Sequence, residues 1–180
     1  MAKTDDSNAK ANRDNFAVVG ELVLAASALD VQVAKVIIEV LDLGTSPMLL
    51  PVIVTIDSVR KIEILKERVA HMPKGVWTTK LDEFITKVES VFKHRNIACH
   101  TPLSIEAGNW TLRPVAAAKL MKRLQLEKGK LNHFSINDLR NAISTAEKAL
   151  VASVNLVENF KRVNVKKHEH IGRITGQPIS

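Results

Sequence analysis

Four stretches of the chain place apolar residues at the three- and four-residue spacing of a helix with one buried face. They cover roughly residues 14–43, 56–72, 79–100 and 136–162, and Pro or Gly residues stand between them. The third stretch has the clearest pattern. Its apolar positions are Leu81, Phe84, Ile85, Val88, Val91 and Phe92. The pattern predicts an all-α fold, a bundle of four main helices.

The first stretch carries a wide apolar stripe, so we expect its helix to pack on more than one neighbour. Asp14 fits an N-cap and Gly44 fits a helix stop. Leu24 and Val31 lie outside the main stripe. A central helix of the bundle is the simpler interpretation, and a share in a dimer interface is the alternative.

The segments between the helices are less regular. Residues 45–55 contain two prolines among apolar residues, which predicts a buried connection. In 101–134, residues 110–113 fit a short strand, while 122–126 and 130–134 fit a hairpin. Pro114 and the alanine run at 116–118 fit the start of a short helix equally well. The expectation is therefore a small irregular or hairpin insertion before the last helix.

Local signals mark the helix ends and the solvent faces. Ser135 and Asp138 match a capping box at the start of the last helix, and Thr79 and Asp82 form a looser version. Lys61 is expected on a mixed, solvated face of the second helix. We predict a disordered lead over 1–13, a helical domain over 14–163 and a basic, flexible tail over 164–180.

Composition narrows the range of partners. The net charge of +7 and the pI near 9.6 favour polyanionic partners such as nucleic acid.

Cys99 is the single cysteine, which excludes an intrachain disulfide, and we expect it to be a small packed side chain. Charged residues interrupt the first apolar helix too often for a membrane span, and an apolar leader is missing. The protein is expected to be cytoplasmic, without membrane contact.

One polar cluster ends the third helix. The stripe reaches Arg95 where another apolar residue would fit, and the sequence continues Asn96-Ile97-Ala98-Cys99-His100. Asn96 and His100 lie four residues apart and so share nearly one face of the helix. Because Pro102 disfavours helical backbone at the residue before it, His100 should lie at the helix C-terminus. A cation, an amide and an imidazole meet there, which indicates a functional site.

The segment Arg95-Asn96-x-x-x-His100 resembles the core motif of HEPN (higher eukaryotes and prokaryotes nucleotide-binding) domains. These are small α-helical domains that include many metal-independent endoribonucleases. The resemblance covers residues 14–163 and implies an RNA-cleaving homodimer without a cofactor. In this interpretation His100 is the base, Arg95 clamps the phosphate, and Asn96 orients one of them. Lys93 and His94 would contact substrate at the rim.

Two observations weigh against an active site. An Arg-Asn pair at a helix end also serves to bond exposed carbonyls, and a C-terminal histidine is favoured by the helix dipole. Thr101 and Pro102 follow the motif where many family members carry a small residue. The alternative function is therefore a catalytically silent helical module that binds nucleotide, RNA or a partner protein. The resemblance leaves a cognate protein inhibitor open.

Overall fold

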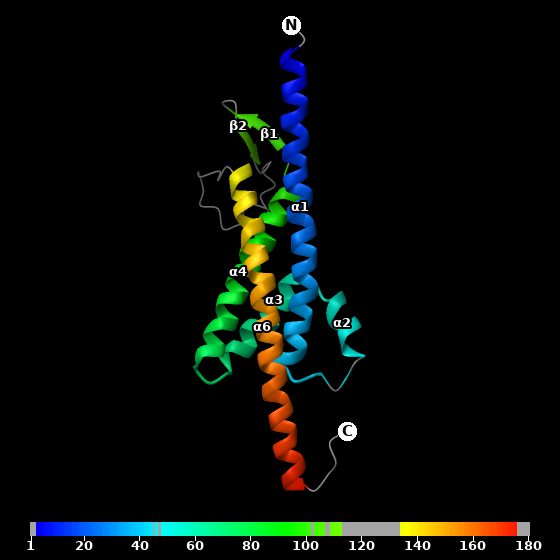
Figure 1. Cartoon of the computed structure of the whole chain (residues 1–180), viewed down its shortest axis with the longest axis vertical. Coiled ribbons are helices and arrows are strands. Elements are labelled where there is room, and N and C mark those ends of the chain that lie inside the picture. Colours follow the sequence, from blue (N-terminus) through cyan, green and yellow to red (C-terminus); the bar gives the residue numbers. More distant parts are fainter. Residues whose placement is uncertain are drawn as a thin grey trace. The chain divides into compact units, whose positions relative to one another are not determined.

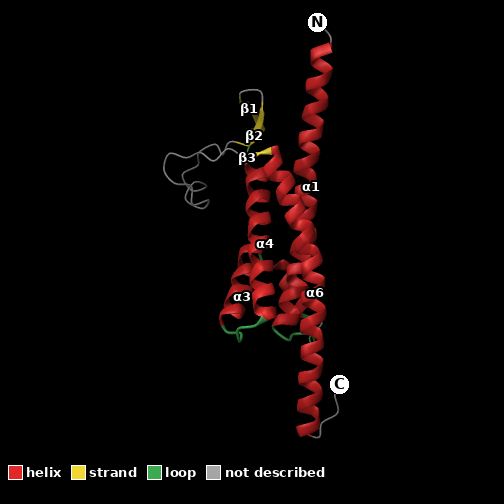
Figure 2. Ribbon diagram, turned by 60° about the vertical axis from the view of Figure 1, so that its left-hand side comes forward, coloured by secondary structure: helices red, strands yellow, loops and turns green. Residues whose placement is uncertain are grey.

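The computed structural model describes residues 3–44, 46, 48–101, 103–106, 109–112 and 134–175 (Figure 1). Helices make up most of this described chain (Figure 2), so the all-α prediction is confirmed. The chain divides into two compact units. Unit 1 takes the described residues within 1–27 and 89–147, and unit 2 takes those within 28–88 and 148–180. The elements are α1 (Lys3–Val40), α2 (Leu49–Thr55), α3 (Ser58–Ala70), α4 (Val76–His100), β1 (Leu103–Glu106), β2 (Asn109–Leu112), β3 (Phe134–Ser135) and α6 (Ile136–Thr175).

The apolar stripe of α4 is buried as predicted. Phe84 and Val88 are fully buried in unit 2, and Val91 and Phe92 are buried in unit 1. Burying such a side chain contributes about 1.5–3 kcal/mol relative to leaving it exposed. The helix begins at Val76 rather than 79, and the hydroxyl of Thr79 donates to the carbonyl oxygen of Gly75 at 3.2 Å. The looser capping box at Thr79 was therefore a wrong prediction, because this hydroxyl bonds backward within the first turn.

Unit 1 contains a small antiparallel sheet with strand order β1-β2-β3. Ile105 pairs with Trp110 and Leu112 pairs with Phe134, so the predicted strand is confirmed over 110–112, and residue 113 lies outside the described residues. The hairpin strand predicted at 122–126 lies outside the described residues. Ser135 and Asp138 form a reciprocal capping box. The backbone N–H of Ser135 donates to Asp138 Oδ2 at 2.7 Å, and the backbone N–H of Asp138 donates to Ser135 Oγ at 3.2 Å.

Helix α1 extends further than the pattern predicted. It begins at Lys3, so residues 3–13, predicted as a disordered lead, are helical, and Asp14 lies inside the helix instead of capping it. The apolar pattern is absent over 1–13, and so periodicity could not detect this part of the helix. Between Arg13 and Val40, α1 is long and apolar enough to cross a membrane, a test that the core helix of a soluble protein also passes. The cytoplasmic location stays a prediction.

The segment 45–55 was predicted as a buried connection, but it contains helix α2, and most of the apolar side chains there are exposed. Only Ile53 is buried in it, while Met48, Leu50, Val52 and Val54 are exposed. Pro51 lies in the first turn, where its missing N–H would have no partner within the helix, so the segment can be helical. A single short helix buries one face only, and the remaining apolar side chains stay on the surface.

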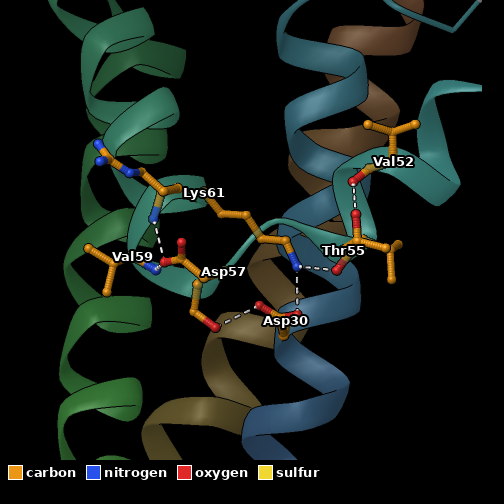
Figure 3. Close-up of polar contacts among 9 residues, drawn as sticks. Asp30, Val52, Thr55, Asp57, Val59 and Lys61 are labelled. Atoms are coloured by element: carbon orange, nitrogen blue, oxygen red, sulfur yellow. Dashed lines mark hydrogen bonds and ion pairs between the residues drawn. The ribbon is translucent and has the colours of Figure 1, made fainter.

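An ion pair between the buried Lys61 and Asp30, whose side chain is 27% exposed, joins α1 and α3 within unit 2, and a hydrogen bond from Lys61 adds α2 (Figure 3). The ammonium of Lys61 is fully buried and donates to Asp30 Oδ2 at 2.6 Å and to the carbonyl oxygen of Val54 at 3.1 Å. The hydroxyl of Ser58 donates to the other carboxylate oxygen of Asp30 at 3.0 Å. Asp57 caps α3 by accepting from the backbone N–H of Val59 at 2.9 Å. Lys61 is thus not on a solvated face, and that prediction was wrong.

The C-terminal end of α1 closes in a Schellman motif. Asp42 adopts the left-handed conformation with φ of 58°. The N–H of Leu43 donates to the carbonyl oxygen of Ile38 at 2.8 Å, and the N–H of Asp42 donates to that of Glu39 at 3.1 Å. Gly44, predicted as the stop, lies just beyond. Asp is one of the few residues other than glycine that adopt this conformation routinely.

Side chains from α3 and α6 complete this closure. Asn164 Nδ2 donates to the carbonyl oxygen of Glu39 at 2.8 Å, and Arg68 Nε donates to that of Val40 at 3.2 Å. Lys167 Nζ lies 2.6 Å from Asp42 Oδ2, and His168 Nε2 lies 3.1 Å from it. Burial raises the pKa of Asp42, but the hydrogen bond from Lys167 and the charges of His168 and Lys167 outweigh it and lower the pKa below 3.8.

These contacts change the description of the C-terminal segment. Helix α6 starts at Ile136 as predicted but continues to Thr175, so residues 164–175, predicted as a flexible tail, are helical. The buried seam of α6 includes Ser153 and Leu156, while Val154 is exposed. Ser153 is tolerated there because its hydroxyl donates to the carbonyl oxygen of Leu150 at 2.6 Å.

Candidate active site

The last two turns of α4, in unit 1, contain all five residues predicted for the site. Ile97 and Ala98 are buried there and fix the rotation of the helix about its axis. The helix ends at His100 as predicted, and Thr101 leaves it. The polar residues therefore project from a packed helix end rather than from a loop, which gives them a defined direction.

Three of the five side chains share one solvent-facing side. Lys93, Asn96 and His100 are all exposed, at successive spacings of three and four residues. At about 100° per residue these positions lie within roughly 60° of one another around the helix. The structure thus brings an ammonium, an amide and an imidazole to a common exposed face.

Arg95 points elsewhere. Five residues separate it from His100, which places the two about 140° apart around the helix axis. Arg95 is half-buried, and its guanidinium carbon lies 6.0 Å from the centre of the Phe92 ring. Such stacking orients a guanidinium while leaving its edge N–H groups available to an anion. Within one copy of the chain, Arg95 and His100 therefore do not face a common point.

Cys99 lies one turn after Arg95 on the same side of α4 and is exposed. The expectation of a small packed side chain was therefore wrong. The sequence places Cys99 beside the buried Ile97 and Ala98, but the helix has turned this position to solvent.

His94 is a half-buried residue with two structural contacts. Its Nδ1 lies 2.7 Å from the carbonyl oxygen of Ser90. Because a carbonyl can only accept, Nδ1 carries the proton and donates, which leaves Nε2 as the acceptor of the neutral ring. The ring also meets Phe134 of β3 edge-on, with centroids 5.6 Å apart. His94 links α4 to the sheet, and its contact with substrate stays a prediction.

From the sequence, Thr101 was noted only as a departure from the HEPN pattern, not as a buried polar residue. Its side chain is buried, and its hydroxyl oxygen has no hydrogen-bond partner among the described residues. An unpaired buried hydroxyl costs about 1–3 kcal/mol. No sequence pattern signals it, since a threonine before a proline usually marks only the helix boundary.

No three His, Cys, Asp or Glu side chains in the described ranges gather closely enough to hold a metal ion. His168, next to Glu169 and His170, instead bonds to Asp42. The absence of a cofactor stays a prediction.

Comparison of the chain with protein-family models, with curated proteins and with solved structures gave no match. The end of α4 and its resemblance to the HEPN motif are therefore the basis for a proposed function.

Proposed function

We propose that this protein is a metal-independent endoribonuclease of the HEPN type, acting in defence or stress. The observation that carries the proposal is the last turn of α4. There the sequence Arg-Asn-x-x-x-His exposes Asn96 and His100 one turn apart, while Ile97 and Ala98 hold the turn in place. A HEPN-like arrangement of the helices around this motif is part of the same proposal.

The side chains present can supply the required chemistry. His100 takes the proton from a ribose 2′-hydroxyl, whose oxygen then attacks the adjacent phosphorus. The bond to the 5′-oxygen breaks, that oxygen takes up a proton, and a 2′,3′-cyclic phosphate remains. Arg95 offers two parallel N–H donors to the phosphate oxygens as negative charge develops there. Asn96, one turn before His100, orients the imidazole or the phosphate.

A homodimer is part of the proposal because one copy directs Arg95 and His100 to different sides of α4. A two-fold axis near the helix end would let the arginine of one copy face the histidine of the other. Unit 1 also exposes large apolar side chains of α1, since Phe16 is 62% and Leu24 is 73% exposed. Burying them against a second copy would stabilise the pair. Light scattering should give the mass of a dimer at micromolar concentration, and a monomer mass would contradict this.

The second candidate function is a catalytically silent module that binds RNA, nucleotide or a partner protein. It is favoured by the stacking of Arg95 on Phe92 and by its angular separation from His100 in a single chain. The exposed face of Lys93, Asn96 and His100 would then bind an anion without cleaving it. A cognate protein inhibitor would belong to the first proposal only.

A cleavage assay separates the two functions. Purified protein should cut mixed single-stranded RNA in EDTA, leave 2′,3′-cyclic phosphate ends and spare DNA of the same sequence, because DNA lacks the 2′-hydroxyl that acts as nucleophile. Product ends are identified by their resistance to ligation at the 3′ end until acid opens the cyclic phosphate and a phosphatase removes the resulting monophosphate. Binding of RNA without cleavage would favour the silent module.

A further inference from the structure

The outer side of α6 in unit 2 carries a line of cations, which we call the basic stripe: Lys148, Arg162, Lys166 and Arg173. All four side chains are exposed. At about 100° per residue, their spacings of 14, 4 and 7 residues keep them within roughly 40° of one another around the helix. The buried Leu156 and Phe160 lie well around the helix from the stripe.

Contacts with α1 hold the helix beneath the basic stripe. Asn164 donates to the carbonyl oxygen of Glu39 at 2.8 Å, while Lys167 and His168 bond to Asp42 at 2.6 and 3.1 Å. These three residues lie on the side of α6 that continues its buried seam. Their bonds set the rotation of α6 where Arg162 and Lys166 point outward, so the stripe belongs to a docked helix.

Little acidic charge opposes the basic stripe. From residue 161 to 175 the chain has Lys161, Arg162, Lys166, Lys167 and Arg173 against the single acid Glu169. Glu158 approaches Arg162 at 4.0 Å, but both side chains are largely exposed, at 61% and 79%. Such an exposed ion pair is weak, so another anion easily replaces Glu158 as the partner of Arg162. Of these five cations, only Lys167 forms an ion pair with Asp42.

The spacing of the cations suits a phosphate backbone. Arg162 and Arg173 stand about 16 Å apart along the helix axis. Nucleic acid presents one charge per ~3.4 Å of each strand, so several phosphates fit along the stripe. We propose that the basic stripe is a docking surface for the RNA backbone, separate from the motif at the end of α4. This rests on RNA being the substrate of the proposed function.

RNA fits this surface better than an anionic membrane does. A helix that lies in a membrane interface inserts the apolar face opposite its cations. On α6 that face is occupied around residues 160–168 by the bonds to α1. A phosphate backbone requires only the exposed cations.

The test measures RNA affinity in the triple variant Arg162→Gln, Lys166→Gln and Arg173→Gln. The readout is fluorescence anisotropy of a labelled single-stranded RNA, with His100→Ala in every protein so that cleavage cannot interfere. We expect affinity at moderate salt to fall at least tenfold. The slope of log affinity against log salt should flatten by about 2, because each phosphate contact on a single strand contributes ~0.7.

The matched control removes three exposed cations elsewhere in unit 2, by Lys35→Gln, Arg60→Gln and Lys74→Gln. It changes the net charge equally and should lower affinity far less. A second control keeps the charges but exchanges the side chains: Arg162→Lys, Lys166→Arg and Arg173→Lys. It should retain RNA binding if the affinity lost in the Gln variant reflects lost charge. Thermal melting of each variant checks the fold.

If the stripe variant and the control variant lose equal amounts of RNA affinity, the proposed role of the basic stripe is overturned. An unchanged RNA affinity in the stripe variant would overturn it as well. Vesicles containing phosphatidylserine that bind through the stripe, with no RNA binding, would also overturn it. RNA binding that depends on the stripe without cleavage by the wild type would sustain this inference while contradicting the nuclease. Cleavage without dependence on the stripe would do the reverse.

Discussion

An Asp30→Ala variant should lose about 3–5 kcal/mol of unfolding free energy, the usual cost of leaving a buried charge unpaired. The ammonium of Lys61 has no exposure and lies 2.6 Å from the carboxylate of Asp30. After the substitution only the carbonyl oxygen of Val54, at 3.1 Å, still accepts from it. Ser58 also loses the oxygen to which it donates. Urea unfolding monitored by circular dichroism measures the loss.

Two further variants test the cause of that loss. Arg60→Ala removes an ion pair with Glu63 that has the same 2.6 Å separation but is largely exposed, and it should cost less than about 1 kcal/mol. Lys61→Met in the Asp30→Ala background removes the unpaired charge and should restore much of the stability. If Asp30→Ala lowered the free energy of unfolding as little as Arg60→Ala, burial of Lys61 would not be the cause of the loss.

The substitution His100→Ala should lower the rate of RNA cleavage on the order of a hundredfold or more, because it removes the general base. Arg95→Ala should cost as much, since it removes the charge stabilisation. Asn96→Ala should cost less if the amide only orients its neighbours. Initial rates on a labelled single-stranded RNA in EDTA measure all three effects.

His71→Ala is the matched control for His100→Ala. His71 is likewise an exposed histidine at the C-terminal end of a helix, and its Nδ1 lies 2.8 Å from the carbonyl oxygen of Glu67. It belongs to unit 2 and the motif belongs to unit 1, so its removal should leave cleavage unchanged. Equal cleavage by wild type and His100→Ala would mean that the site is misplaced or that a contaminant acts.

The sequence pattern predicted the parts of the fold that depend on residues close together in the chain. The buried face of α4 follows from apolar spacing, and the start of α6 follows from the Ser135–Asp138 box. The predictions failed where a partner is distant in sequence. Lys61 resembles a surface residue in the sequence, because its partner Asp30 lies 31 residues away on another helix.

The candidate site shows the same division. Its position at the end of α4 and the shared face of Asn96 and His100 could be predicted from spacing and from Pro102. The stacking of Arg95 on Phe92 and the exposure of Cys99 could not, because both depend on how α4 is rotated against its neighbours. The basic stripe was also hidden, since two of its residues, Lys166 and Arg173, had been assigned to a flexible tail.

The closure of α1 by Asn164 has a consequence for how the chain matures during synthesis. Asn164 and Glu39 are separated by 125 residues, and the contact of Lys167 with Asp42 spans as many. A ribosome extends a chain by roughly 5–20 residues per second. The end of α1 therefore waits several seconds, with its carbonyls bonded only to water or to nearer side chains, until α6 has emerged. Unit 2 can be completed only after α6 has been synthesised, and until then its apolar surfaces are open to chaperones.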